Sequence, residues 1–141
     1  MESKTPFRLT KSELEIMEVL WSENRPLSRS FIIGHAPHRS WKDSSIHILL
    51  NSMLDKGAIE IVGFEQTGRR IARTFSPTLT ADEYYVMQIK SSSCYTSDNL
   101  PHLLSALISD DDISDDLLDK LCAVIEERRE QLHNENKEST T

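Results

Sequence analysis

Apolar residues recur at helical spacing in one central stretch of the chain, between residues 43 and 57. The residues at positions i, i+3, i+4 and i+7 of this stretch are Ile46, Leu49, Leu50 and Met53. That spacing is typical of the buried face of an amphipathic helix. Asp43 or Ser44 is placed to cap the start of the helix, and Gly57 to take the left-handed conformation just past its end. The pattern therefore predicts a helix of about four turns.

A hairpin is predicted directly after this helix, over residues 58–75. Its β-branched and aromatic residues flank Glu65-Gln66-Thr67-Gly68, a four-residue segment ending in glycine that predicts the turn. The hairpin carries the arginines Arg69, Arg70 and Arg73. A capped helix followed at once by a basic two-stranded wing is typical of a DNA-binding module.

Two further helices are predicted before this pair. Thr10-Lys11-Ser12-Glu13 has the pattern of a capping box and predicts a helix from residue 11 to about 22. Ser28 is placed to cap a short helix that ends near Ala36, because the residue before Pro37 is disfavoured in helical geometry. Three helices and a wing within about 65 residues match the size of one winged helix-turn-helix domain.

The second half of the chain predicts helices with apolar faces. A second capping box begins at Thr80, Pro101 stands early in a short helix, and a last helix spans residues 115 to about 132. These short leucine-rich helices bury too little for an independent monomer, so we expect them to pack against a second copy of the chain. The residues expected at this interface are Leu103, Leu104, Leu107, Ile108, Leu117, Leu118, Leu121 and Ile125.

The predicted fold is therefore mostly α with a small β-hairpin. A winged-helix DNA-binding domain is expected over residues 1–78, a helical dimerisation domain over residues 79–133, and a disordered tail over residues 134–141.

The charge of the chain differs between its two halves. A net charge of −7 over 141 residues argues against a nucleic-acid partner, because DNA binding requires Lys and Arg at the phosphates. Residues 1–80, however, hold 11 Lys and Arg against 9 Asp and Glu, whereas residues 81–141 hold 5 against 14. The first part is mildly basic and the second strongly acidic, which fits a DNA-binding head joined to an acidic assembly domain.

Other classes of function find little support in the sequence. No stretch approaches the roughly 18 apolar residues that span a membrane, and the start lacks the apolar core of a signal peptide, so we expect a cytoplasmic protein without direct membrane binding. Cys94 and Cys122 lack metal or disulfide spacing and are expected to be buried. His35 and His38 stand three apart, but Pro37 interrupts any helix between them. We predict no metal, no cofactor and no enzymatic activity.

Four segments of the chain resemble the penicillinase repressor and methicillin-resistance regulator family of transcription factors. Residues 14–21, LEIMEVLW, are similar to the family's first helix, and residues 44–57 to its recognition helix. Residues 68–77 are similar to the wing, and Glu83-Tyr84 to the start of the helix that follows it. The resemblance covers roughly residues 7 to 130.

The resemblance implies a homodimer in which each winged helix binds one half of a palindromic operator in double-stranded DNA. At the recognition helix, however, His47 and Ser52 stand where the family has basic residues, so no bidentate arginine contact to guanine is available there. The bases would be contacted by Ser44, Ser45, His47 and Asn51, and the phosphates by Lys42, Arg69, Arg70 and Arg73. An alternative is a winged helix that has lost sequence-specific DNA binding and pairs with another regulator or a sensor.

The resemblance also implies a mode of inactivation. In the best-known members a membrane sensor protease triggers cleavage of the repressor, typically at an Asn-Phe bond, which would fall at Ala106-Leu107 here. The residue types at this bond do not match. The paired C-x-C motifs of the copper-sensing branch are absent from the sequence.

Overall fold

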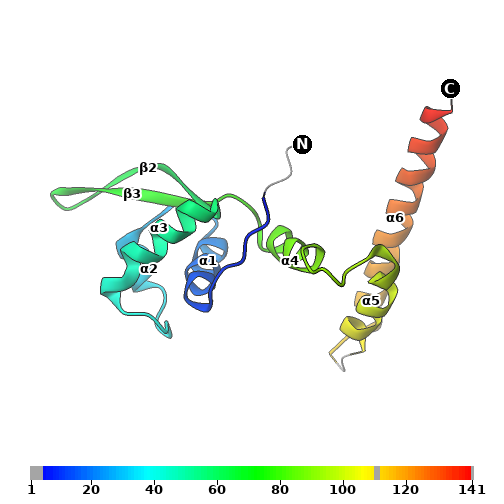
Figure 1. The fold of residues 1–141 in the computed structure, drawn as a ribbon, viewed down its shortest axis with the longest axis horizontal. Helices are drawn as coiled ribbons and strands as arrows, with labels where there is room; N and C mark the ends of the chain where they lie inside the picture. The colour runs from blue at the N-terminus through cyan, green and yellow to red at the C-terminus, as the bar shows by residue number, and fades with distance from the viewer. Residues whose placement is uncertain (1–4, 110–111, 141) are drawn as a thin grey trace. The chain divides into compact units, whose positions relative to one another are not determined.

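The computed structural model describes residues 5–109 and 112–140, which form two compact units, the first ending at Tyr95 and the second beginning at Thr96 (Figure 1). The elements of the first unit are α1 (Lys11–Glu23), β1 (Leu27–Ser28), α2 (Arg29–Gly34), the 3-10 turn η1 (Asp43–Ser45), α3 (Ile46–Lys56), β2 (Ile59–Thr67), β3 (Arg70–Pro77) and α4 (Ala81–Lys90). Those of the second unit are η2 (Ser97–Asn99), α5 (Leu100–Ile108) and α6 (Asp115–Ser139). The predicted class, mostly α with a small β part, is confirmed.

The helix ends follow the capping rules from which they were predicted. Thr10 and Glu13 form a capping box at the start of α1, and Thr80 and Glu83 form a second one at the start of α4. The side chain of Ser28 accepts the backbone N–H of Phe31 and so caps α2. Each of these side chains satisfies backbone donors that the first helical turn leaves unpaired.

The start of α3 differs from its prediction. Neither Asp43 nor Ser44 caps the α-helix, because both lie in the 3-10 turn η1 and the α-helix begins only at Ile46. The carboxylate of Asp43 instead forms an ion pair with Arg39, from the loop before it. Gly57 ends α3 with a positive φ of 81°, as predicted.

The wing is part of a three-stranded antiparallel sheet in the order β1-β3-β2. The sequence predicted two strands and missed β1, which is two residues long. Strand β2 continues through Thr67 and β3 resumes at Arg70, so the turn consists of Gly68 and Arg69 rather than residues 65–68. A two-residue hairpin loop needs a positive φ, which Gly68 adopts at 65°.

The buried apolar side chains of the described residues all belong to the first unit. They are Leu9, Ile16, Met17, Leu20, Leu27, Ile32, Ala36, Trp41, Ile46, Leu50, Met53, Ala58, Ile59, Phe75, Leu79 and Tyr84. In Figure 1, α1, α2 and α3 gather at one end of the hairpin, and the rest of β2 and β3 extends beyond them. This helical head holds α3 beside the base of the wing.

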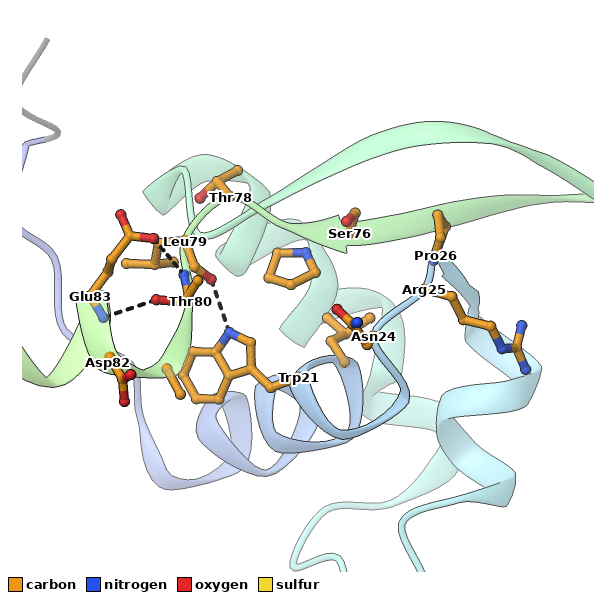
Figure 2. Close-up of a pocket in the computed structure, with 13 residues that line it drawn as sticks. Trp21, Asn24, Arg25, Pro26, Ser76, Thr78, Leu79, Thr80, Asp82 and Glu83 are labelled. Atoms are coloured by element: carbon orange, nitrogen blue, oxygen red, sulfur yellow. Dashed lines mark hydrogen bonds between the residues drawn. The ribbon is translucent and has the colours of Figure 1, made fainter. Parts of the chain in front are cut away.

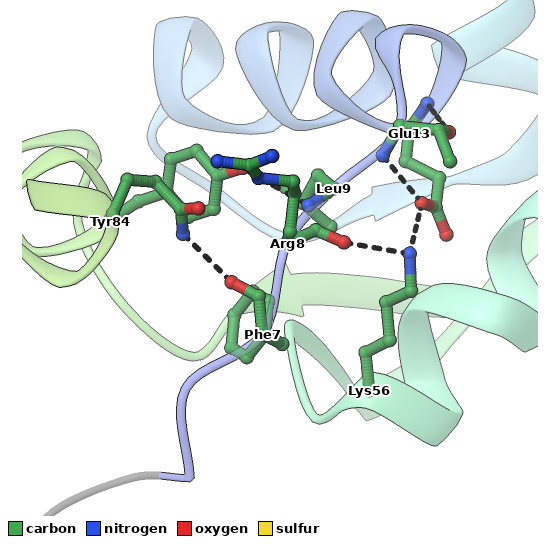
Figure 3. Close-up of polar contacts among 8 residues, drawn as sticks. Phe7, Arg8, Leu9, Glu13, Lys56 and Tyr84 are labelled. Carbon is green, nitrogen blue, oxygen red and sulfur yellow. Dashed lines mark hydrogen bonds and ion pairs between the residues drawn. The ribbon is translucent and has the colours of Figure 1, made fainter. Parts of the chain in front are cut away.

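Helix α4 packs on the head, which explains why the first unit extends past the predicted boundary at residue 78. The Tyr84 hydroxyl, on α4, accepts the backbone N–H of Leu9 at 3.0 Å, and Gln88 donates to the Phe7 carbonyl at 2.7 Å (Figure 3). The Trp21 indole N–H donates to the Leu79 carbonyl at 2.9 Å just before α4 (Figure 2). The first two bonds attach α4 to the N-terminal arm, and the third attaches the residues just before α4 to α1.

A buried ion pair joins α1 to α3 under the N-terminal arm. The Glu13 side chain is 1% exposed, and Lys56 donates to its Oε1 at 2.5 Å and to the Arg8 carbonyl at 2.9 Å (Figure 3). Burial raises the pKa of the Glu13 carboxyl, but hydrogen bonds from Lys56, Thr10 and Ser52 outweigh burial and leave that pKa below its usual value. The Glu13 carboxyl therefore favours its charged form although it is buried.

The second unit has longer helical structure than predicted and no buried side chain among its described residues. Helix α6 continues to Ser139, whereas disorder was predicted from residue 134; Thr141 lies outside the described residues. Its last turns are rich in Glu, Arg and Gln, which are strong helix formers. Ion pairs between neighbouring turns, such as that of Arg129 Nη1 with Glu126 Oε1 at 2.9 Å, further stabilise the helix.

Two further observations bear on the expected class of protein. None of the described helices combines the length and the apolar composition that a crossing of the lipid bilayer requires. Cys94 and Cys122 are both exposed, whereas the sequence predicted that they would be buried.

Candidate nucleic-acid interface

Helix α3 presents a mostly polar face to solvent. Its buried residues are Ile46, Leu50 and Met53, and its exposed residues are His47, Ile48, Asn51 and Asp55. Ser44 is exposed in the turn before α3, and Ser45 is half-buried. Ser52, which the sequence placed on the outer side, is half-buried and contributes a hydrogen bond that lowers the pKa of Glu13. The outer face of α3 therefore contains no Lys or Arg among these residues.

The positive charge lies instead beside α3, around a groove of about 410 Å³ between this helix, the start of α2 and strand β3. The described residues that line it are Arg29, Ser30, His47, Leu50, Asn51, Thr67, Arg70, Ile71, Ala72, Arg73 and Phe75. None of these is acidic. A groove with only positive formal charges attracts phosphate, and its donors suit phosphate oxygens.

Arg29 is the one lining cation that the sequence analysis missed. It is the first residue of α2, directly after the Ser28 cap, and its guanidinium contacts a ring nitrogen of His47 on α3. A neutral imidazole accepts such a bond through its unprotonated nitrogen. The position of Arg29 just after a predicted cap was visible in the sequence, but its proximity to α3 depends on how the two helices pack.

Arg73 reaches the groove although its backbone position faces the core side of the hairpin. The ladder pairs Phe64 with Arg73 and Gln66 with Ile71, and its bulge lies in β2 at Val62, so β3 itself is regular. The Arg73 side chain runs along Phe75, with its guanidinium carbon 5.7 Å from the ring centroid. An arginine can bury its stem against an aromatic ring while its charge stays in water.

The groove brings together part of the predicted DNA-binding set. Its lining includes His47, Asn51, Arg70 and Arg73, whereas Lys42, Ser44, Ser45 and Arg69 are not among the lining residues. Lys42 and Arg69 are exposed, the first before η1 and the second at the tip of the wing. A separate groove beside α1 has a lining of mixed charge, with Glu15, Glu18 and Glu23 as well as His35, His38 and Arg39, and so differs from the basic groove, which has no carboxylate.

The predicted dimerisation residues fall into two groups. Leu103, Leu104, Ile108, Leu118 and Leu121 are half-buried within the second unit, whereas Leu107, Leu117 and Ile125 are exposed. The exposed group is extended by Leu100, Val124 and Leu132. These side chains form apolar surface on α5 and α6 that the described residues of the second unit leave uncovered.

The predicted cleavage position lies inside a helix. Ala106 and Leu107 are both exposed residues of α5. Among the residues that the structure describes, no three His, Cys, Asp or Glu side chains gather as a metal site would require.

The helices, the antiparallel wing and the basic groove beside the third helix define a winged helix-turn-helix transcriptional regulator. Residues 9–127 match the penicillinase repressor family, and the chain belongs to that family. Members of this family bind operator DNA as dimers and are not enzymes.

One similar sequence and one similar solved structure show how much of the chain each resemblance covers. An uncharacterized 16.5 kDa protein from the ptsI 3′ region of Latilactobacillus sakei is 33% identical over 87 residues, which make up 62% of this chain and 55% of that protein. The match thus spans about half the length of this curated relative. Staphylococcus aureus MarR in complex with salicylate and kanamycin aligns at a TM-score of 0.39 and 15% identity, over 89% of this chain and 74% of that one.

Proposed function

We propose that this protein is a transcriptional repressor that binds a palindromic operator as a homodimer. The basic groove between α2, α3 and β3 carries the proposal, because it joins the exposed residues of α3 to the arginines of the wing on one surface. In winged-helix proteins of this class the third helix enters the major groove and cations nearby hold the phosphate backbone.

Each group of residues then has a distinct role. The short polar side chains of Ser44, Ser45, His47 and Asn51 contact base edges, and Arg29 joins Lys42, Arg69, Arg70 and Arg73 as a phosphate contact. Because α3 lacks an arginine, base discrimination is weaker than in a repressor with a bidentate arginine–guanine pair, which contributes about 1–3 kcal/mol.

The second unit supplies the dimer. Its exposed side chains include Leu107, Leu117 and Ile125, and burying each against a second copy gains about 1.5–3 kcal/mol. A two-fold axis through this interface presents two heads to the two halves of a palindrome.

Binding of DNA duplexes across a salt series tests the proposal. Duplexes selected from a random pool are titrated with the full-length protein, and the dissociation constant is measured by fluorescence anisotropy. A dimer that places up to ten cations at phosphates, five from each head, gives a slope of log K against log salt as steep as about −9. Binding that is absent even at low salt would refute the proposal.

A second function is favoured by one observation, the absence of Lys and Arg from the exposed face of α3. Under this alternative the head is a protein-interaction module that pairs with another regulator or with a membrane sensor protease. The same titration distinguishes the two functions, because a module of this kind binds no duplex with a several-ion salt slope.

A further inference from the structure

One aliphatic side chain lies at the centre of the outward face of α3. Ile48 is 73% exposed, whereas Ile46, Leu50 and Met53 of the same helix are 2%, 3% and 0% exposed. With about 100° between successive residues, Ile48 lies almost opposite the mean direction of these three buried residues. Its exposure therefore follows from its position on the helix and would persist in any side-chain conformation.

Ile48 contributes little to the stability of the head in this position. An isoleucine is a weaker helix former than most residues of an exposed helix face, and at 73% exposure it hardly packs against the core. Isolated exposed aliphatic residues are common on protein surfaces. This one is distinguished by its neighbours, because it lies among the polar side chains that face the same way.

The neighbours of Ile48 indicate what would cover it. Ser44 and Asn51 stand one helical turn before and after it, and Asn51 also lines the groove that contains Arg29, Arg70 and Arg73. A partner that lies over this surface must therefore present anionic groups beside the helix and an apolar group against its centre. In the major groove of DNA, the phosphates supply the anionic groups. The C5-methyl group of thymine supplies the apolar group, since it is the apolar group on the major-groove edges of the four bases.

We propose that Ile48 is a specificity-determining residue that contacts the C5-methyl group of a thymine in each half of the operator. This inference rests on the proposed DNA-binding function and adds to it a preference for a base. Ile48 thus adds an aliphatic base contact to a helix whose exposed face lacks arginine. The protein is then expected to select thymine by shape and apolar contact, where hydrogen bonds alone would not distinguish thymine from uracil.

Replacement of thymine by deoxyuridine isolates this contact. Deoxyuridine keeps every hydrogen-bonding group of thymine and lacks only the methyl, whose burial contributes the equivalent of about one CH₂ group. Loss of one such methyl is expected to weaken binding about fourfold, and loss of the matching methyl in both half-sites about 15-fold.

The experiment uses a duplex selected from a random pool by the wild-type full-length protein. Each thymine of the half-sites is replaced in turn by deoxyuridine, and the dissociation constants are measured for the wild type and for Ile48→Ser. Serine has nearly the same helix propensity as isoleucine and removes the aliphatic surface. Ile89→Ser is the matched control, because Ile89 is also an exposed isoleucine on a helix, α4, and is not among the residues that line the basic groove.

The proposal expects one position in each half-site where deoxyuridine weakens binding of the duplex by the wild type and by Ile89→Ser. The same replacement is expected to leave binding by Ile48→Ser unchanged. Three results would overturn it: selected half-sites without thymine, no such loss at any thymine, or a loss that Ile48→Ser retains. Each of these leaves the DNA-binding function intact, since binding is still measured. A wild type that binds no duplex at low salt would overturn both.

Discussion

The two units of this chain differ in how far they bury their apolar side chains. The first unit buries a continuous core from Leu9 to Tyr84, whereas the described part of the second unit has no buried side chain and exposes apolar residues along α5 and α6. A head that closes its own core can fold as a unit and present a fixed surface. Helices with uncovered apolar faces need a second surface, and family members bind their operators as dimers.

The largest expected effect is on formation of the dimer by the second unit. We expect Ile125→Asp to raise the dissociation constant of the dimer at least about 1,000-fold, because a symmetric interface loses the burial of two side chains and gains two buried charges. Sedimentation velocity measures this constant. Ala123→Asp, which introduces the same charge on the opposite side of α6, is expected to leave the dimer intact. A dimer unaffected by Ile125→Asp would show that α6 lies outside the interface.

The next effect is on the stability of the head. Lys56→Met leaves the buried carboxylate of Glu13 without its cation and is expected to lower the free energy of unfolding by about 3 kcal/mol. Urea denaturation followed by the fluorescence of the two tryptophans, which both lie in the head, measures this loss. Lys56→Arg, which keeps the charge, should lose much less. Equal losses in the two variants would assign the effect to packing.

The pH dependence of this stability follows from the lowered pKa of Glu13. Because the pKa is lower in the folded state, the carboxylate contributes stability above its unfolded pKa of about 4.3, and this contribution is lost as pH falls through the folded value. The wild type is therefore expected to exceed Glu13→Gln in unfolding free energy at pH 7, by a margin that shrinks below about pH 4. A margin that stays constant between pH 7 and pH 3 would contradict this assignment.

The smallest effect concerns the wing. Arg70→Ala is expected to weaken DNA binding severalfold for all sequences and to reduce the salt slope by about 2 per dimer, one for each head. Arg25→Ala is the control, since Arg25 lies over the ring of Phe31 and is not among the residues of the basic groove. If both variants change the slope equally, the groove is not the phosphate-binding surface.

Local chemistry in the sequence was sufficient to predict much of the head. The capping boxes at Thr10 and Thr80, the cap at Ser28 and the left-handed Gly57 all depend on residues within four positions of one another. The structure has these caps as predicted, because few other interactions compete with a cap at an exposed helix end. The amphipathic spacing of α3 succeeded for the same reason, since its period is a property of the helix alone.

The differences arise where a distant residue decides the local structure. Tyr84 accepts a bond from Leu9, 75 positions earlier, which attaches α4 to the head. The position of Arg29 beside His47 likewise depends on the packing of α2 against α3. No pattern within a short window of the sequence contains these contacts.

Hydroxyl-radical footprinting on a selected duplex tests most directly whether two heads present α3 and its basic groove to one DNA molecule. The account predicts two protected patches related by two-fold symmetry, with centres one helical turn or a whole number of turns apart, and their joint loss in Ile125→Asp at the same protein concentration. A single protected patch that persists unchanged in Ile125→Asp would contradict it.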